Sequence, residues 1–344
     1  MEQFAVAIVN YNTREHLRAC LSTVLSEAPS EVVVVDNASS DDSAAAVETE
    51  YPHVILQANR TNVGYARAAN QAMSRCKAKY VLLLNADTLI RPRTLVELKR
   101  YLDHHPRAAI VGPRLEEPDG TLQASCYPFP TPLNTFLENS TIAVVVGRRI
   151  RRHIPFLRNL YLRTWPHARP RIVPWVKGAA LAVRRDAFEA VGGFDESFFM
   201  YFEDADLCYR LGRCGWEVHF TPTATVVHVG GASTVQCHAE MAVQLLASTL
   251  KFYQRHSSRV RYAEVITILK TMMLARWISG KLALYVTRDV RTRARLTEEI
   301  AASQKVILGR WQVQGSRTSA YDINGSVTPG RQSETRCGSE TPRG

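Results

Sequence analysis

The sequence lacks several patterns that would assign it to a common class of protein. Its seven cysteines form no Cys-x-x-Cys pair and no metal-ligand spacing; they are Cys20, Cys76, Cys126, Cys208, Cys214, Cys237 and Cys337. An odd number of cysteines without such a framework is typical of reduced thiols in a cytosolic protein. The chain starts with a strand-like run from Phe4 to Val9 and shows no basic segment before a cleavage site. We therefore expect no signal peptide and a cytoplasmic protein.

Long apolar runs are also missing. No stretch reaches the roughly 18 uncharged apolar residues that a membrane-spanning helix needs. The longest candidate, residues 263–286, is interrupted by Glu264, Lys270, Arg276 and Lys281. We expect a chain that is soluble or attached to a membrane surface, but not one that spans the membrane.

Acidic residues are absent from Arg148 to Arg185, where arginine is frequent. This block contributes to a formal net charge of +11. Such a block can meet phosphate groups, anionic lipid or nucleic acid, or it can be an ordinary solvated surface. The block alone does not decide between these partners.

The first 112 residues alternate strand-like and helix-like segments. Strands are expected at 4–9, 31–36, 54–57, 80–84 and 108–111, with helices beginning near residues 12, 41, 64 and 92. The 344 residues contain 46% hydrophobic and 22% charged residues, which is ordinary for a globular protein. The alternation predicts an α/β fold with a largely parallel sheet and right-handed crossovers.

Polar side chains follow the first four predicted strands at the point where each strand ends. They are Asn10 and Asn12, Asp36 and Asn37, Asn59 and Asn62, and Asn85 and Asp87. In sheets of this kind, ligands bind at the carboxyl ends of the strands. Asn and Asp also favour turns for local reasons, but four equivalent occurrences favour a binding site. A carboxylate such as Asp87 at this edge can bind Mg²⁺ or Mn²⁺ together with a diphosphate.

A run of aromatic and apolar residues at 192–202 leads directly into Glu203, Asp204 and Asp206. Carboxylates against a water-poor wall can hold a cation or take up a proton, because a low dielectric strengthens both interactions. Acidic capping of the helix expected at 203–214 is the alternative. It explains one or two of the three carboxylates, but not their place after the aromatic run.

The pattern is weaker from 117 to 171, where we expect little regular structure. Further strands are expected at 175–184, 216–220 and 225–229, and helices at 186–191, 239–256 and 262–286. Beyond about residue 315 the chain is rich in Ser, Thr, Gly and Arg, which predicts disorder. This gives a catalytic domain at 1–238, a helical extension at 239–312 and a disordered tail at 313–344.

Taken in order, six motifs resemble the family 2 glycosyltransferases, and within them the rhamnosyltransferase-like branch of cell-envelope polysaccharide assembly. They are residues Val9–Asn12, Val35–Asp41, Asn62–Asn70, Leu84–Asp87, Lys177–Ala179 and Gly193–Arg210. The resemblance covers about residues 4–235 and implies a GT-A fold and inverting transfer from a nucleoside-diphosphate sugar. The chain departs from the family in one place, since Asn85-Ala86-Asp87 stands where Asp-x-Asp is usual.

The resemblance also implies roles for individual residues. Asp204 matches the catalytic base, with Glu203 and Asp206 as supporting acids, and Asp87 matches the ligand of Mg²⁺ or Mn²⁺. His228 lies where related enzymes have a histidine that can complete the metal shell, although such a residue is often only a hydrogen-bonding partner. The nucleotide-sugar site is expected to contain Asn10, Asn12, Asp36, Asn37, Asn62, Gly64, Tyr65, Asn70 and Asn85. The acceptor site is expected to contain Trp175, Lys177, Gly178 and Tyr201, of which the two aromatic residues fit the protein core equally well.

The expected donor is a dTDP- or UDP-linked sugar, with rhamnose favoured by resemblance, and the expected acceptor is a glycan or a lipid-linked sugar. Nucleic acid is not expected as a partner. The arginine block and the stretch 262–286 suit an anionic membrane surface on the inner face of the cell membrane, but that stretch equally suits a helix packed on the domain. A sugar nucleotidyltransferase is a weaker alternative, because it needs a glycine-rich basic loop that Val9–Arg14 lacks. A silent binding protein could have lost Asp204, which is present.

Overall fold

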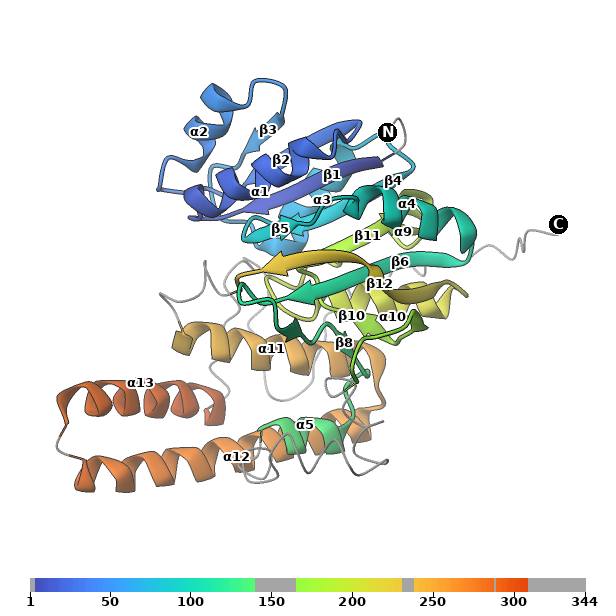
Figure 1. The fold of residues 1–344 in the computed structure, drawn as a ribbon. Helices are drawn as coiled ribbons and strands as arrows, with labels where there is room; N and C mark the ends of the chain where they lie inside the picture. Colours follow the sequence, from blue (N-terminus) through green and yellow to red (C-terminus); the bar gives the residue numbers. More distant parts are fainter. Residues whose placement is uncertain (1–3, 140–164, 231–237, 288, 309–344) are drawn as a thin grey trace.

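The computed structural model describes residues 4–139, 165–230, 238–287 and 289–308. Figure 1 shows a twisted sheet with helices on both of its faces and further helices gathered below it. The elements of the first half are β1 (Phe4–Asn10), α1 (Arg14–Ser26), β2 (Glu31–Asp36), α2 (Ser43–Glu50), β3 (Ile55–Ala58), α3 (Tyr65–Arg75), β4 (Tyr80–Asn85), β5 (Thr88–Ile90), α4 (Thr94–His104), β6 (Ala108–Glu116), β7 (Leu122–Gln123), β8 (Cys126–Tyr127) and α5 (Pro132–Asn139). Those of the second half are β9 (Arg171–Ile172), β10 (Trp175–Val176), β11 (Ala180–Arg184), α9 (Arg185–Ala190), α10 (Glu203–Arg213), β12 (Glu217–His228), α11 (His238–His256), α12 (Arg259–Val286) and α13 (Val290–Ile307).

The main sheet has the strand order β3-β2-β1-β4-β11-β6-β12-β5. The neighbouring pairs from β3 to β4 are parallel, and so is the pair β6–β12. β11 is antiparallel to both β4 and β6, and β5 is antiparallel to β12. The α/β fold with a mixed, mainly parallel sheet, expected for a GT-A protein, is confirmed.

Strand β1 shows how the sequence specifies this arrangement. All seven residues are buried, because neighbouring strands and helices cover both faces of the strand. Phe4, Val6 and Ile8 point into the core below α1, α2 and α4, while Ala5 and Ala7 point into the core below α3, α9 and α10. Alternate residues of a strand face opposite sides, so one apolar run supplies two cores.

Most predicted strands and helices are confirmed within one to three residues at each end. Two predictions about strands are wrong. The run 175–184 is not one strand, because β10 pairs with β8 in a separate two-stranded sheet, while β11 lies in the main sheet. The runs 216–220 and 225–229 belong to one strand, β12, in which the pairing with β6 shifts between Thr221 and Thr225. The short strand β5 was not predicted from the sequence.

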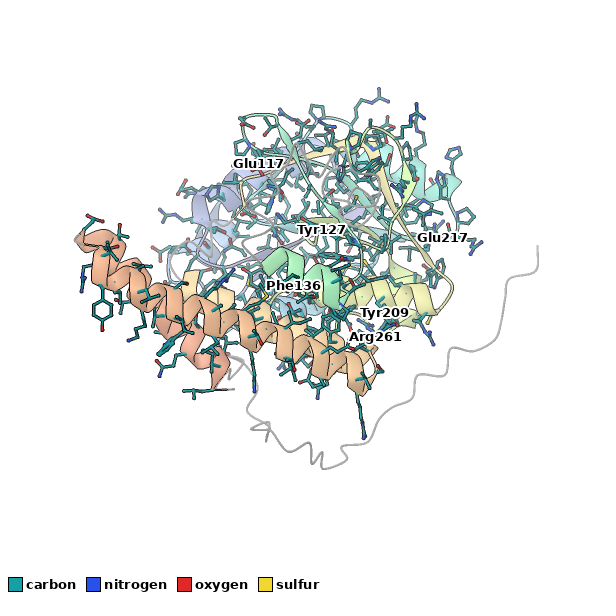
Figure 2. The ribbon with its side chains drawn as sticks, turned by 90° about the horizontal axis from the view of Figure 1, so that it is seen from below. Glu117, Tyr127, Phe136, Tyr209, Glu217 and Arg261 are labelled. Carbon is teal, nitrogen blue, oxygen red and sulfur yellow. The ribbon has the colours of Figure 1, made fainter. Side chains whose placement is uncertain are left out.

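Three helices, α11, α12 and α13, form the expected helical extension. In Figure 1, α11 lies beneath α10 and β8, and α12 lies farther from the sheet. Figure 2, seen from below, shows α12 running across this face beside α5, which carries Phe136 and contacts α12. Among the described helices, none is long and apolar enough to cross a membrane. The predicted tail at 313–344 and the arginines at 148–163 lie outside the described residues.

Candidate functional site

The ends of β1 and β2 meet in a buried polar network. Asn10 and Asp36 are paired in register across the two parallel strands, and Asn10 Nδ2 donates to Asp36 Oδ1 at 2.8 Å. Asn10 is fully buried and Asp36 is 2% exposed. The two predicted residues therefore lie together at the carboxyl edge of the sheet, as the parallel register requires.

Ser39 belongs to the same network and was not singled out from the sequence. Its backbone N–H donates to Asp36 Oδ2 at 2.9 Å, and its hydroxyl donates to Asp36 Oδ1 at 2.6 Å. The Ser39 hydroxyl also accepts from the backbone N–H of Asn12 at 2.9 Å. Ala38, at φ 66°, turns the chain so that Ser39 reaches back to the carboxylate. The signal available in the sequence was Asp-x-x-Ser after a strand, a common local turn.

The residues that follow β2 and β3 form a second polar group beside the first. Asn37 Nδ2 donates to Asn62 Oδ1 at 2.8 Å, and Asn37 Oδ1 accepts from the backbone N–H of Val63 at 3.0 Å and from Asn59 Nδ2 at 3.1 Å. Asn62 Oδ1 also accepts from the N–H of Gly64 at 3.0 Å. These bonds order the loop that leads into α3.

Gly64 allows the aromatic run to approach this loop. Its φ is +85°, and a Cβ at this position would lie 2.7 Å from both the ring and the carbonyl oxygen of Phe199. The next residue, Tyr65, donates its backbone N–H to the same carbonyl at 2.7 Å. A glycine is therefore required by both the backbone conformation and the close contact.

Asp204 lies in the first turn of α10 with both carboxylate oxygens hydrogen-bonded. Oδ2 accepts from the backbone N–H of Gly178 at 2.8 Å, and Oδ1 accepts from that of Ala205 at 2.8 Å. Burial raises the pKa of Asp204 to about 6, although these two N–H groups and the charge of Lys177 act in the opposite direction. A carboxyl group with this pKa is ionised at neutral pH and can accept a proton near it.

Tyr65 lies close to the three acidic groups of the site. Its hydroxyl donates to the carbonyl oxygen of Gly178 at 3.2 Å. The pKa of Tyr65 is raised well above its usual value by burial, and then by the charges of Glu203, Asp204 and Asp87. Tyr65 therefore stays protonated as a hydrogen-bond donor, and it connects the strand-end side of the site with the carboxylate side.

Glu203 is 6% exposed, and its Oε2 atom is buried without a hydrogen-bond partner among the described residues. Burial and then the charge of Asp204 raise the pKa of Glu203 well above its usual value. Glu203 therefore carries a proton more readily than its neighbour. The structure brings these two predicted acids together at the start of α10.

Asp206 does not share this environment. It is fully buried, with Oδ2 2.7 Å from Arg210 Nε and Oδ1 2.7 Å from His256 Nε2. Burial would raise the pKa of Asp206, but the hydrogen bonds and charges of His256 and Arg210 outweigh it and lower the pKa. Its carboxylate is held by Arg210 of α10 and His256 of α11, and its role as a supporting acid stays a prediction.

Asp87 and His228 face each other across the edge of the sheet. His228 pairs with Thr88 in the β12–β5 ladder, and His228 Nε2 lies 3.5 Å from Asp87 Oδ1. The other ring nitrogen, Nδ1, lies 2.7 Å from Gln123 Oε1 and 3.5 Å from Lys177 Nζ. Burial would raise the pKa of Asp87, but the hydrogen bond and charge of His228 outweigh it and keep the pKa low. Gln123 is a further site residue that was not predicted.

These residues fit a divalent cation that also binds a diphosphate. Mg²⁺ commonly takes one or two carboxylates from the protein and completes its shell with phosphate oxygens and water. Asp87 supplies one carboxylate, and Asn85 Oδ1, two residues earlier, is buried without a hydrogen-bond partner in the described chain. The described residues contain no group of three or more His, Cys, Asp or Glu side chains that could hold a metal by itself. The ligand shell would therefore depend on the substrate.

The structure also gives the surroundings of the predicted residues Trp175, Tyr201 and Asn70. Trp175 stacks on Tyr127 at 4.5 Å, and its Nε1 donates to the Pro128 carbonyl at 2.8 Å. Trp175 is only partly buried, as is Tyr201. Figure 2 labels Tyr127 on the side of the fold seen from below. The amide group of Asn70 is engaged by the loop, because it donates to the Phe194 carbonyl and accepts from the Phe194 N–H, both at 2.9 Å. Sugar binding by these residues stays a prediction.

The chain is similar to known glycosyltransferases. Residues 2–247 match the model of the glycosyltransferase-like family 2. N-acetylglucosaminyl-diphospho-decaprenol L-rhamnosyltransferase of Mycobacterium tuberculosis is 32% identical over 266 residues, covering 73% of this chain and 84% of that protein. Low-salt glycan biosynthesis hexosyltransferase Agl10 of Haloferax volcanii is 24% identical over 83% of this chain and 88% of its own.

Among solved structures, mannosyltransferase PcManGT from Pyrobaculum calidifontis, in complex with GDP-Man and Mn²⁺, is 17% identical with a TM-score of 0.48, covering 89% of this chain and 87% of that one. The family match spans both groups of strand-end residues and the Glu203–Asp204 pair. The chain belongs to the family 2 glycosyltransferases and is a glycosyltransferase.

Proposed function

We propose that this enzyme transfers a deoxyhexose, rhamnose in the first instance, from a dTDP- or UDP-sugar to a hydroxyl group of a lipid-linked or growing envelope glycan, with inversion at the anomeric carbon. The observation that carries the proposal is the environment of Asp204: a buried carboxylate, fixed by two backbone N–H groups, with a pKa of about 6. The rhamnosyltransferase of M. tuberculosis supports the choice of sugar and of acceptor class.

Inverting transfer is a single displacement, so the attacking hydroxyl must lose its proton as the new bond forms. Asp204 is suited to accept that proton, because at neutral pH it is ionised yet holds a proton more tightly than an exposed aspartate. General-base assistance of this kind contributes about 10²–10⁴ in rate. The N–H of Gly178 fixes the orientation of the carboxylate, which gives the attack a defined direction.

The donor is proposed to bind along the strand-end network, with its nucleoside beside Asn10, Asp36 and Asn62 and its diphosphate near Asp87. A divalent cation held by Asp87 and His228 would offset the charge that develops on the leaving diphosphate. Lys177, whose Nζ is 3.5 Å from His228 Nδ1, adds a positive charge on the same side. Tyr65 supplies a protonated hydroxyl between the donor side and the base.

We further propose peripheral attachment to the inner face of the membrane through α12. The exposed apolar residues Leu274, Ile278 and Leu282 are 46%, 47% and 62% exposed and recur every four residues along the helix. Spacing of this kind places them on one side of the helix. A lipid-linked acceptor would then be presented close to the enzyme.

The substitution Asp204→Asn tests the proposed function. We expect kcat to fall by about 10²–10⁴ while the affinity for the nucleoside-diphosphate sugar stays within about twofold, because only proton acceptance is lost. Transfer is measured with radiolabelled dTDP-rhamnose or UDP-sugars and a polyprenyl-diphospho-N-acetylglucosamine acceptor, and donor affinity is measured by calorimetry. In the wild type, kcat/KM should fall about tenfold per pH unit below pH 6, where Asp204 becomes protonated.

Asp186→Asn is the matched control. Asp186 also lies in the first turn of a helix, and its Oδ1 accepts the N–H of Ala187 at 2.8 Å, but the side chain is exposed and far from the carboxylate pair in the sequence. Its turnover should equal that of the wild type. Retained turnover in Asp204→Asn would exclude the assignment of the base. A new bond with the same anomeric configuration as the donor, seen by NMR, would exclude inversion.

A further inference from the structure

The turn directly before the base has an unfavourable backbone conformation. Tyr201 and Phe202 have φ values of 68° and 66°, so two consecutive residues other than glycine lie in the left-handed region. Such a conformation is unfavourable for a residue with a side chain and persists only where the surrounding structure fixes it. Glu203 and Asp204 follow at once, so the position of the base depends on what holds this turn.

Two carbonyl groups just before the turn are held from different parts of the fold. Phe199 O accepts the backbone N–H of Tyr65 from α3 at 2.7 Å. Met200 O accepts the hydroxyl of Ser248 from α11 at 2.7 Å and approaches Gln244 Nε2 at 3.4 Å. Both Gln244 and Ser248 are buried. The segment before the strained turn is therefore held by one hydrogen bond from α3, on the proposed nucleotide-sugar side of the site, and by another from α11.

More contacts from α11 follow on the same side of the helix. Lys251 Nζ donates to the carbonyl oxygen of Ser197, and Arg255 forms an ion pair with Asp195. Arg255 Nη2 also donates to Ser197 Oγ at 3.2 Å. The spacing 244, 248, 251, 255 is the i, i+4, i+7, i+11 pattern of one helix face, so a single face of α11 contacts the whole loop.

The same helix also reaches α10 itself. His256 Nε2 lies 2.7 Å from Asp206 Oδ1, two residues after the base. Phe252 packs with Phe202 and Tyr209 in a small apolar cluster at ring distances of 5.8 and 5.9 Å. The segment 195–206 is thus fixed along its length by α11.

We propose that α11 is part of the catalytic unit and that Ser248 is a positioning residue, which fixes the turn at Tyr201–Phe202 and through it the carboxylate of Asp204. This inference rests on the proposed role of Asp204 as the base. The catalytic domain would then end after α11, and not at residue 238 as predicted from the sequence.

The variant Ser248→Ala removes the hydroxyl that binds Met200 O and leaves the helix otherwise unchanged. We expect kcat to fall about tenfold or more, because small displacements of a catalytic group are costly, while the Kd for UDP or dTDP stays within about twofold. The matched control is Thr249→Val. The Thr249 hydroxyl is also buried on α11, but it donates to Leu245 O of its own helix at 2.8 Å.

Gln244 can take over part of the role of Ser248, since its Nε2 lies 3.1 Å from Ser248 Oγ and 3.4 Å from Met200 O. The double variant Ser248→Ala with Gln244→Leu should therefore lose more activity than Ser248→Ala alone. Arg255→Gln, at the exposed end of the same face, provides a second single variant, and it should lower kcat with unchanged nucleotide affinity.

Hydrogen exchange supplies a readout that does not depend on activity. Amides of residues 199–206 should exchange at least about tenfold faster in Ser248→Ala than in the wild type or Thr249→Val. The inference is overturned if Ser248→Ala matches Thr249→Val in both kcat and exchange, or if both variants lose kcat equally. If the wild-type enzyme transfers no sugar, the proposed function fails, and the exchange data alone decide whether α11 holds the turn.

Discussion

At the residue scale, the site depends on how a few buried polar groups are paired. Asp204 and Asp206 are only two positions apart in α10, yet one accepts two backbone N–H groups and the other is held by Arg210 and His256. Successive helix residues are turned by about 100° from each other, so these two carboxylates point in nearly opposite directions. Two acids that are neighbours in the sequence therefore have different hydrogen-bond partners in the structure.

The metal proposal is tested at the same scale. If Asp87 holds a divalent cation together with the donor diphosphate, Asp87→Ala should abolish the increase in UDP or dTDP affinity that Mn²⁺ produces in the wild type. Calorimetry with and without Mn²⁺ measures this directly and needs no turnover. Asp119→Ala, in an exposed turn where Asp119 binds only Thr121, is the control and should keep the full metal effect. Unchanged metal dependence in Asp87→Ala would contradict the assignment.

The sequence predicts the strand-end residues well for a physical reason. Asn10 and Asp36 follow two apolar runs, and a parallel register then brings them to one edge without any further information. Ser39 and Gln123 could not be found in this way. The first is placed by a left-handed residue at Ala38, and the second reaches His228 from 105 positions away in the sequence.

At the scale of elements, the same limit applies to β10 and β11. The run 175–184 is apolar enough for one strand, but β10 pairs with β8 in the small sheet and β11 with β4 and β6 in the main sheet, and a Cβ on Gly178 between them would lie 3.2 Å from Asp204 Oδ2. Close approach to a distant side chain leaves no periodic signal. The contacts of α11 with the loop are equally invisible in the sequence, because His256 is 50 residues from its partner Asp206.

An element-scale prediction concerns the end of α4. Arg184, on β11 and 6% exposed, donates to the carbonyl oxygens of Leu102 at 2.9 Å, His105 at 3.2 Å and Ala108 at 3.0 Å. Arg184→Met removes these three hydrogen bonds, although the His105 carbonyl oxygen still accepts the backbone N–H of Ala108 at 3.0 Å, and each hydrogen bond to a charged group contributes about 1.5–3 kcal/mol. We expect the free energy of unfolding to fall by about 3 kcal/mol or more in urea titrations.

Arg184→Lys is the companion variant. A lysine keeps the charge and can reach one carbonyl oxygen, but it lacks the planar group that donates to several acceptors. The free energy of unfolding of Arg184→Lys should therefore lie between those of the wild type and Arg184→Met. The kcat of the folded fraction should remain that of the wild type in both variants. An unchanged free energy of unfolding in Arg184→Met would show that water molecules replace the arginine as hydrogen-bond donors to these carbonyl groups.

At the scale of the whole molecule, a net charge of +11 and the exposed face of α12 lead to a prediction about membranes. The enzyme should co-sediment with vesicles that contain anionic lipid and bind less as salt rises, since the Debye length falls from about 10 Å at 0.1 M to about 3 Å at 1 M. Leu282→Glu, on the exposed face of α12, should weaken binding further. Absence of binding at every salt concentration would exclude peripheral attachment.

The backbone of Gly178 connects the position of β10 with the proton affinity of the base. It follows β10, which pairs with β8 in the small sheet, while its N–H bonds to Asp204 and its carbonyl group bonds to Tyr65. That N–H lowers the pKa of Asp204, so any movement of β10 that lengthens the bond raises the proton affinity of the carboxylate. If the acceptor binds against Trp175, as the sequence predicts, its contact with β10 would therefore change the proton affinity of Asp204.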